Sequence, residues 1–394
     1  MTAPLALPKP IALYVHWPYC ARICPYCDFN VAKARGGPEP ARLGRAILKD
    51  IGHQAEGLGP RRLSSIFFGG GTPSLMEVSL AAEIIALAKR LWPPAGDEIE
   101  VTLEANPTDA EAGRFAAFAE AGVNRLSLGV QSLDDRALAF LGRNHDAAEA
   151  RRAAKIAGEA FARLSIDLIY ARPDQTAAAW RAELAEVIAL GAEHISAYQL
   201  TIESGTAFQR AVGRGAWAPP GEDLSADLYE ATDEVLAGAG YEAYEVSNHA
   251  RGKAARSRHN LAYWRGEDYL GAGPGAHGRL TRNSRRVATL AATRAADYIG
   301  RVEKAGPGVE VVEPLSARQV ALERLLMGLR TCEGVAWGDL AALELFPDSP
   351  VLADLNGGWL EPTPERLTAT TKGRAVLDQL ILVLAKQARA AAEP

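Results

Sequence analysis

Short apolar runs alternate with longer Ala-rich stretches over the first half of the chain. The apolar runs are rich in Val, Ile, Leu and Phe, which is typical of buried strands, whereas the Ala-rich stretches have helical spacing. The predicted strands are Ile11–Trp17, Ser65–Phe68, Ile99–Glu104, Arg125–Val130, Leu164–Tyr170 and His194–Leu200. The predicted helices are Ala41–Glu56, Val78–Leu91, Ala110–Ala121, Ala147–Ala160 and Ala177–Ala189.

Strands that alternate with helices in this way indicate βαβ units and a parallel sheet, hence an α/β fold. A partial (β/α)6 barrel of the TIM type and an open doubly wound sheet both fit the periodicity. Chemically useful groups follow the strands near their C-terminal ends, and parallel strands bring those ends to one rim, where barrel enzymes form their active sites. These groups are the cysteine loop after Trp17, Gly69–Thr72, Glu104, Gln131, Asp167 and Gln199.

The second half of the chain has a different pattern. From Tyr241 to Arg286 the alternation stops, and Ala305–Gly308 is predicted to be a linker between a core of residues 1–300 and a small domain of residues 310–394. The small domain shows two helices, two short strands around a Pro-containing turn and a long helix from Thr371, an order typical of a winged-helix-like domain. Cys332 lies among its helical residues and is predicted to be a small buried apolar side chain.

Charge and composition narrow the classes of partner. The formal net charge of −5 is too mild to indicate nucleic acid or an anionic membrane as the main partner. The small domain carries 8 basic and 11 acidic residues from position 311 onward, a net of −3, whereas a DNA-reading wing should be basic. No apolar run approaches the ~20 residues that span a bilayer, and no signal peptide is evident. We therefore expect a cytoplasmic protein with at most peripheral membrane contact, and a homodimer is left open.

The clearest candidate for chemistry is a cysteine loop. Cys20, Cys24 and Cys27 follow the first predicted strand in a Cys-x3-Cys-x2-Cys pattern, which does not resemble a disulfide framework. A cubane iron–sulfur cluster accepts three thiolates on three irons, and its fourth iron is then free for a small chelating molecule. The alternative is a zinc site with a fourth ligand, for which His16 or Asp28 is available.

Further motifs accompany these cysteines along the chain. Together with the cysteines, they resemble the motifs of the radical SAM superfamily. Within it, the chain is similar to the branch of the oxygen-independent coproporphyrinogen III dehydrogenases and the HemW heme chaperones. The resemblance runs from Ile11 to Gly278 and continues into the C-terminal domain. The motifs are Leu13–Cys20, Cys24–Cys27, Phe68–Pro73, Glu104–Pro107, Leu128–Gln131, Ile166–Tyr170 and His259–Trp264.

The resemblance implies a 4Fe-4S cluster on the three cysteines and S-adenosylmethionine (SAM) on its open iron. The residues that it assigns to SAM are Tyr14, Gly70, Gly71, Thr72, Glu104, Gln131, Arg143 and Asp167. Physical reasons support two of these assignments. Glycines at a strand end let a ligand approach the backbone closely, and a carboxylate such as Asp167 inside an apolar strand must be paired or bind a ligand. The alternatives are a plain tight turn, a rim ion pair for Glu104, a structural ion pair for Asp167, a core aromatic for Tyr14 and a solvated helix residue for Arg143.

Two departures favour the heme chaperone over the dehydrogenase. The dehydrogenases have a further cysteine where this chain has Phe29, and they have a longer arm before the cluster than the 19 residues that precede Cys20. The expected function is to bind heme and deliver it to an acceptor protein, a heme-dependent respiratory enzyme. The alternatives are radical decarboxylation of coproporphyrinogen III and, from another class, modification of nucleic acid.

Residues 251–286 support heme binding. They contain nine Lys and Arg residues against Glu267 and Asp268, a net of +7, and arginine suits the carboxylates of a porphyrin. A neutral imidazole can ligate heme iron, and His259 is the first choice for an axial ligand. His259 and His277 can instead be packed, hydrogen-bonded core residues, and the basic run can be a solvated face.

Overall fold

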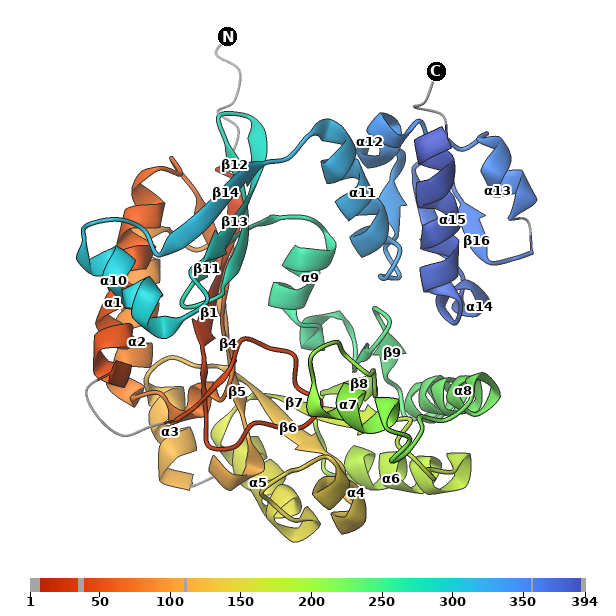
Figure 1. The fold of residues 1–394 in the computed structure, drawn as a ribbon, viewed down its shortest axis with the longest axis horizontal. Helices are drawn as coiled ribbons and strands as arrows, with labels where there is room; N and C mark the ends of the chain where they lie inside the picture. Colours follow the sequence, from red (N-terminus) through yellow and green to blue (C-terminus); the bar gives the residue numbers. More distant parts are fainter. Residues whose placement is uncertain (1–7, 35–38, 110–111, 356, 391–394) are drawn as a thin grey trace.

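In a computed structural model, which describes residues 8–34, 39–109, 112–355 and 357–390, the core is a twelve-stranded sheet (Figure 1). Its centre consists of six parallel strands that neighbour one another in chain order, which confirms the predicted βα units. These strands are β1 (Pro10–Trp17), β4 (Arg62–Gly70), β5 (Glu100–Ala105), β6 (Arg125–Gln131), β7 (Arg163–Tyr170) and β8 (His194–Gln199).

The order of the strands identifies a partial barrel. A doubly wound sheet reverses its strand order at a switch point, whereas here each of the six strands lies beside the next one along the chain. The two edges of the sheet, β14 and β9, are not paired with each other among the described residues, so the barrel stays open. The prediction of a partial (β/α)6 barrel is confirmed.

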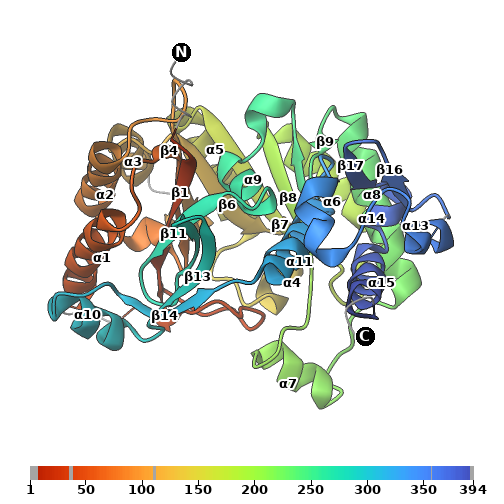
Figure 2. The same ribbon diagram turned by 90° about the horizontal axis from the view of Figure 1, so that it is seen from above.

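Helices pack around the outside of the sheet (Figure 2). They are α1 (Glu39–Glu56), α2 (Val78–Leu91), α3 (Ala112–Glu120), α5 (Ala147–Ala160), α6 (Ala177–Ala189), α8 (Glu222–Gly238) and α10 (Ala295–Glu303). The start of the helix expected from Ala110 lies outside the described residues. Helix α5 begins at a capping box between Asp146 and Glu149, and the residues it buries are all alanines, which let it lie close to the sheet.

Residues 241–314 add strands that the sequence pattern did not reveal. Strand β11 (Asp268–Ala272) lies parallel to β1 on the side away from β4, and β12 (His277–Arg282), β13 (Arg285–Ala291) and β14 (Val309–Pro314) extend the sheet as an antiparallel ribbon. At the other edge, β10 (Asn248–Ala250) and β9 (Glu242–Ala243) follow β8. The short helix α9 (Arg258–Trp264) lies between β10 and β11 in the chain.

The predicted linker at Ala305–Gly308 is a packed turn that leads into β14. The Gly308 amide donates to the buried carboxylate of Asp50 at 2.8 Å, and the Tyr298 hydroxyl donates to the same carboxylate at 2.7 Å. Because β14 belongs to the large sheet, the boundary with the small domain falls after Pro314 and not within this turn.

The small C-terminal domain has its own apolar core and a three-stranded sheet, in the order β15 (Val335–Ala336), β17 (Arg366–Ala369), β16 (Leu360–Pro362). Its helices include α11 (Ala317–Gly328) and α15 (Leu377–Ala390), and the long helix expected from Thr371 is divided into α14 (Thr371–Arg374) and α15. The prediction for Cys332 was wrong. Cys332 is exposed in the turn after α11, where its amide donates to the carbonyl of Tyr244.

Candidate functional site

The interior of the barrel is polar, because alternate residues of the apolar strands carry polar side chains. These side chains face a cavity of about 610 Å³, a size within the usual range for small-molecule sites. From the strands the cavity is lined by Tyr14, His16, Phe67, Gly70, Glu104, Arg125, Ser127, Asp167, His194, Ser196, Tyr198 and Tyr269. From the connecting segments it is lined by Asp28, Phe29, Asn30, His259, Asn260 and Tyr263, among others, and His277 lines it from the start of β12.

The cysteine loop lies at the rim beside this cavity. Two short strands, β2 (Tyr19–Cys20) and β3 (Ala32–Lys33), pair in parallel and hold the two ends of the loop together. Cys20 is buried, whereas Cys24 and Cys27 are half-buried. Burial raises the pKa of Cys27 to about 11 and also raises the pKa of Cys20, so both thiols are protonated at neutral pH until a metal centre takes them as thiolates.

A single zinc ion would need ligands that converge on one point and a fourth side chain beside the three thiolates. Among the described residues no three His, Cys, Asp or Glu side chains converge on one point as ligands of a single ion would. Thiolates of a cubane bind different irons and do not need to converge in that way. His16 is also occupied, because its ring nitrogens contact the Tyr14 hydroxyl at 3.0 Å and the Asn30 carbonyl at 2.8 Å.

The glycine run at the end of β4 is built against the cysteine loop. Gly70 has a φ of +107° and faces the cavity, and a Cβ there would lie 2.6 Å from the His16 ring. The Gly71 amide donates to the Trp17 carbonyl at 2.7 Å, and Thr72 is buried beside Cys20. Gly70 therefore meets the cavity directly, whereas Gly71 and Thr72 fasten the cysteine loop to the sheet.

Glu104 and Asp167 face the cavity without a cation partner. Glu104 accepts the Gly70 amide at 3.2 Å, and burial, with the nearby Asp167 charge, raises its pKa to about 8. Asp167 accepts the hydroxyls of Ser127 and Ser165 at 2.8 and 3.2 Å, and burial raises its pKa as well. The described residues form no ion pair with either carboxylate. Both side chains are thus available to a bound ligand.

Gln131 and Arg143 lie between the cysteine loop and the end of β6. Gln131 has a φ of +64°, unusual for a residue with a side chain, and its Oε1 atom is buried without a hydrogen bond. Arg143 donates to the Cys24 sulfur at 3.3 Å and to the Gly129 carbonyl at 3.0 Å, and its Nε atom is also buried without a partner. Arg143 is therefore not a solvated helix residue. Gln199, the remaining strand-end residue, is exposed and is not among the residues that line the cavity.

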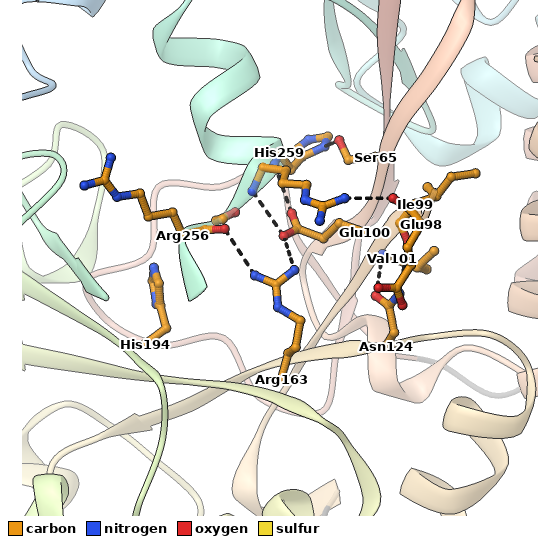
Figure 3. A network of polar contacts seen from close by, with 12 residues as sticks. Ser65, Glu98, Ile99, Glu100, Val101, Asn124, Arg163, His194, Arg256 and His259 are labelled. Atoms are coloured by element: carbon orange, nitrogen blue, oxygen red, sulfur yellow. Dashed lines mark hydrogen bonds and ion pairs between the residues drawn. The ribbon is translucent and has the colours of Figure 1, made fainter. Parts of the chain in front are cut away.

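His259 is at the floor of the cavity and takes part in a buried network (Figure 3). It is 1% exposed, and its Nδ1 and Nε2 atoms contact the Ser65 hydroxyl at 2.9 Å and the Tyr263 hydroxyl at 2.8 Å. Burial lowers its pKa to about 3, so the ring is neutral, the form that ligates iron. Because both nitrogens are engaged, binding of iron by His259 requires one of these hydrogen bonds to open.

An ion pair lies beneath His259. Glu100 accepts the His259 amide at 3.0 Å and the Arg258 amide at 3.1 Å, and it pairs with Arg163 at 2.8 Å (Figure 3). Arg163 also pairs with Glu193 and donates to the Arg256 carbonyl. The network fixes the start of α9, and with it His259, to the first residues of β5 and β7.

Several arginines of the basic stretch are already neutralised by carboxylates. The pairs are Arg256–Glu242, Arg265–Glu333, Arg279–Glu323 and Arg286–Asp268. Two of these carboxylates, Glu323 and Glu333, belong to the small domain, so the pairs join it to the barrel. The expectation that this stretch offers a cluster of free arginines does not hold for these four residues.

Sequence reasoning missed the inward polar residues of β6 and β8, which are Arg125, Ser127, His194, Ser196 and Tyr198. The signal was present in the chain, because these residues recur at every second position of their strands.

Comparisons with known proteins identify the family of the chain. The family model of the radical SAM superfamily matches residues 14–187. The chain is 36% identical over 396 residues to heme chaperone HemW of Mycobacterium tuberculosis, covering 97% of this chain and 98% of that protein. It is 39% identical to heme chaperone HemW of Escherichia coli, covering 72% of this chain and 74% of that protein. It is 41% identical to the mitochondrial radical S-adenosyl methionine domain-containing protein 1 of Bos taurus, and the match covers 95% of this chain and 87% of that protein.

Among solved structures, the fold is similar to that of coproporphyrinogen III oxidase (HemN) from Escherichia coli, described as a radical SAM enzyme. The TM-score is 0.79 with 21% sequence identity, and the match covers 96% of this chain and 90% of that one. The fold, the cysteine loop and the cavity thus define a radical SAM protein. Given the extent of the identity to its relatives, the chain belongs to the HemW-like family of that superfamily.

Proposed function

We propose that the protein binds heme and transfers it to an acceptor protein, and that it uses a 4Fe-4S cluster and SAM to do so. The observation that carries the proposal is the 36% identity to a heme chaperone over 97% of this chain. That identity spans the barrel, the cysteine loop and the C-terminal domain together. The likeness to the coproporphyrinogen oxidase concerns the fold, and Phe29 stands where that family's additional cysteine would be.

The donor set fits the cofactors. Cys20, Cys24 and Cys27 would hold three irons, and the cluster with SAM would supply one-electron chemistry at the rim. For SAM, the unpaired Oε1 of Gln131 and the unpaired Nε of Arg143 offer an acceptor and a donor next to the loop. Glu104 and Asp167 offer acceptors inside the cavity, and Tyr14 offers an aromatic surface beside Gly69. Gly71 and Thr72 would hold the loop against the sheet.

Heme would occupy the remaining part of the cavity. Phe29, Phe67, Tyr263 and Tyr269 give the cavity flat apolar surfaces, which suit a macrocycle. His259 is the proposed iron ligand, with Tyr263 as the partner that its Nε2 atom would release. Phe29 is 60% exposed, so it lies at the open side through which a large ligand would enter.

The place of action is also a proposal. No helix of the described residues is both long and apolar enough to span a membrane. We propose that the protein acts in the cytoplasm on a heme-dependent respiratory enzyme, while the similar bovine protein is named as mitochondrial. Nucleic acid is not a proposed partner, and a homodimer stays a prediction.

Heme titration of the anaerobically reconstituted protein tests the proposal. We expect a saturable Soret band in the wild type, and a reduced affinity or an altered spectrum in His259→Ala. A His277→Ala variant is the matched control, because His277 also lines the cavity but is exposed on β12. Heme-loaded protein should then restore activity to a heme-free respiratory enzyme. Absence of heme binding in the wild type would refute the proposal, and conversion of coproporphyrinogen III with SAM would favour the dehydrogenase.

A further inference from the structure

Arg125 is a buried cation without a hydrogen-bond partner among the described residues. The residue is 2% exposed, it lines the cavity, and its Nε and Nη2 atoms are buried with no acceptor. The next strand, β5, places Thr102 in register with it, and the Thr102 hydroxyl is likewise buried without a partner. Two adjacent donors in the barrel interior therefore lack acceptors.

The other ionisable side chains around Arg125 avoid a buried, unpaired charge, because they are neutral or paired with an opposite charge. A guanidinium cannot become neutral in this way. Burial lowers the pKa of His194 and His259, so both are neutral, and burial raises the pKa of Glu104 to about 8. Glu100 is paired with Arg163. Arginine cannot lose its proton in a protein, and a buried unpaired charge costs several kcal/mol. The charge of Arg125 acts on Asp167, but the buried Nε and Nη2 atoms of Arg125 make no hydrogen bond to that carboxylate.

The position of Arg125 separates it from the residues assigned to SAM. Glu104 is in register with Ser127, whereas Arg125 lies two residues earlier on β6, about 7 Å deeper in the barrel. The cavity reaches this depth, because it is lined by Arg125 and His194, the first residues of β6 and β8. A ligand group at Arg125 would lie below the level of Gly70 and Glu104, next to the floor that carries His259.

We propose that Arg125, with the Thr102 hydroxyl, is the anchor for a carboxylate of a ligand that enters the barrel interior. The guanidinium offers paired donors that match a carboxylate, and the aromatic walls match a flat apolar body on the same ligand. Where the proposed heme binding holds, on which this assignment rests, the group is a heme propionate. A small aromatic carboxylate has the same chemistry and is the second source.

The first arm of the test compares heme with heme dimethyl ester. The esterified propionates carry no charge and cannot form an ion pair with Arg125. The reconstituted full-length wild type should bind heme about 10- to 100-fold more tightly than the ester. Arg125→Met should bind both ligands equally, and Arg125→Lys should recover part of the difference. An unchanged preference for heme in Arg125→Met would overturn the proposal.

The second arm does not depend on heme. Without ligand, Arg125→Met should raise Tm by roughly 2–6 °C, because an unpaired buried charge is replaced by an apolar chain of similar volume. Arg172→Met is the matched control. Arg172 is a buried arginine outside the cavity whose Nη2 pairs with Glu183 at 2.6 Å, so its loss should lower Tm. Added 2-naphthoate should raise the Tm of the wild type and leave Arg125→Met unchanged.

The two arms separate the two claims. If the wild type binds no heme but 2-naphthoate still protects it through Arg125, the heme function fails and the carboxylate site stands. If the wild type binds heme and its ester equally, and 2-naphthoate gives no Arg125-dependent shift, the function stands and the carboxylate site fails. A fall in the Tm of Arg125→Met equal to that of Arg172→Met would show that Arg125 is a structural residue.

Discussion

Glu100 gives the sharpest test of how the floor of the cavity is held. Its side chain is fully buried, and it accepts hydrogen bonds from Arg163 and from two amides at the start of α9. In Glu100→Gln the charge is lost, and the NH2 group that replaces one carboxylate oxygen faces one or two of the three existing donors. Breaking a buried ion pair from one side costs about 3–5 kcal/mol. Arg163 is partly exposed and retains its ion pair with Glu193 in this variant. We therefore expect the free energy of unfolding to fall by the lower value, about 3 kcal/mol, and Tm to fall by about 5 °C.

The matched control is Glu193→Gln, which removes the other partner of the same arginine. Glu193 has a side chain that is 33% exposed, so its pair with Arg163 should contribute less than about 1 kcal/mol. Thermal unfolding followed by circular dichroism under anaerobic conditions measures both variants. We also expect Glu100→Gln to weaken heme binding, since His259 sits on the released turn of α9. Equal stability of the two variants would show that the network does not support the floor.

Three further predictions concern the rim. Gly70→Ala should prevent binding of SAM in equilibrium dialysis and lower Tm, because Gly70 has a positive φ and faces a side chain at 2.6 Å; normal binding would contradict the close approach. Glu104 has its pKa raised to about 8, so the folded state retains a proton that the unfolded state releases above about pH 4.3. Stability should therefore fall between about pH 5 and pH 8 by up to about 1.4 kcal/mol per pH unit, and a slope in Glu104→Gln as steep as that of the wild type would exclude this carboxyl. Cys24→Ala should lower the iron content after reconstitution, whereas the exposed Cys332→Ala should keep it, and iron loss in both would remove the distinction.

The barrel could be predicted from the chain because its six strands are apolar enough to show against Ala-rich helices. Strand β11 escaped because it is short, and Leu270 is the only large aliphatic residue that it contributes to the core between two glycine-rich turns. It is a strand because β1 offers it a free edge, a fact of tertiary packing. The exposed position of Cys332 escaped for a similar reason, since the turn after α11 is held by the carbonyl of Tyr244 from the other domain.

The rim of the candidate site could be predicted from the sequence, whereas the interior of the cavity could not. The cysteine loop and the glycine run carry their chemistry in adjacent residues, so spacing alone indicates a cluster. The pairs that neutralise the basic stretch join residues far apart in sequence, such as Arg279 and Glu323 at 2.8 Å, and charge counting cannot anticipate them. Arg125 illustrates the converse, because only the structure shows that its buried Nε and Nη2 atoms have no acceptor in the part of the chain that is described.

Helix α9 has a mechanical consequence for the whole molecule. It is seven residues and roughly 10 Å long, too short to flex along its axis. His259, near the start of α9, places its imidazole in the barrel interior. At the other end of α9, the Trp264 carbonyl accepts a hydrogen bond from Arg324 of the small domain at 2.7 Å. A displacement of α11 would therefore reach His259 through this short helix.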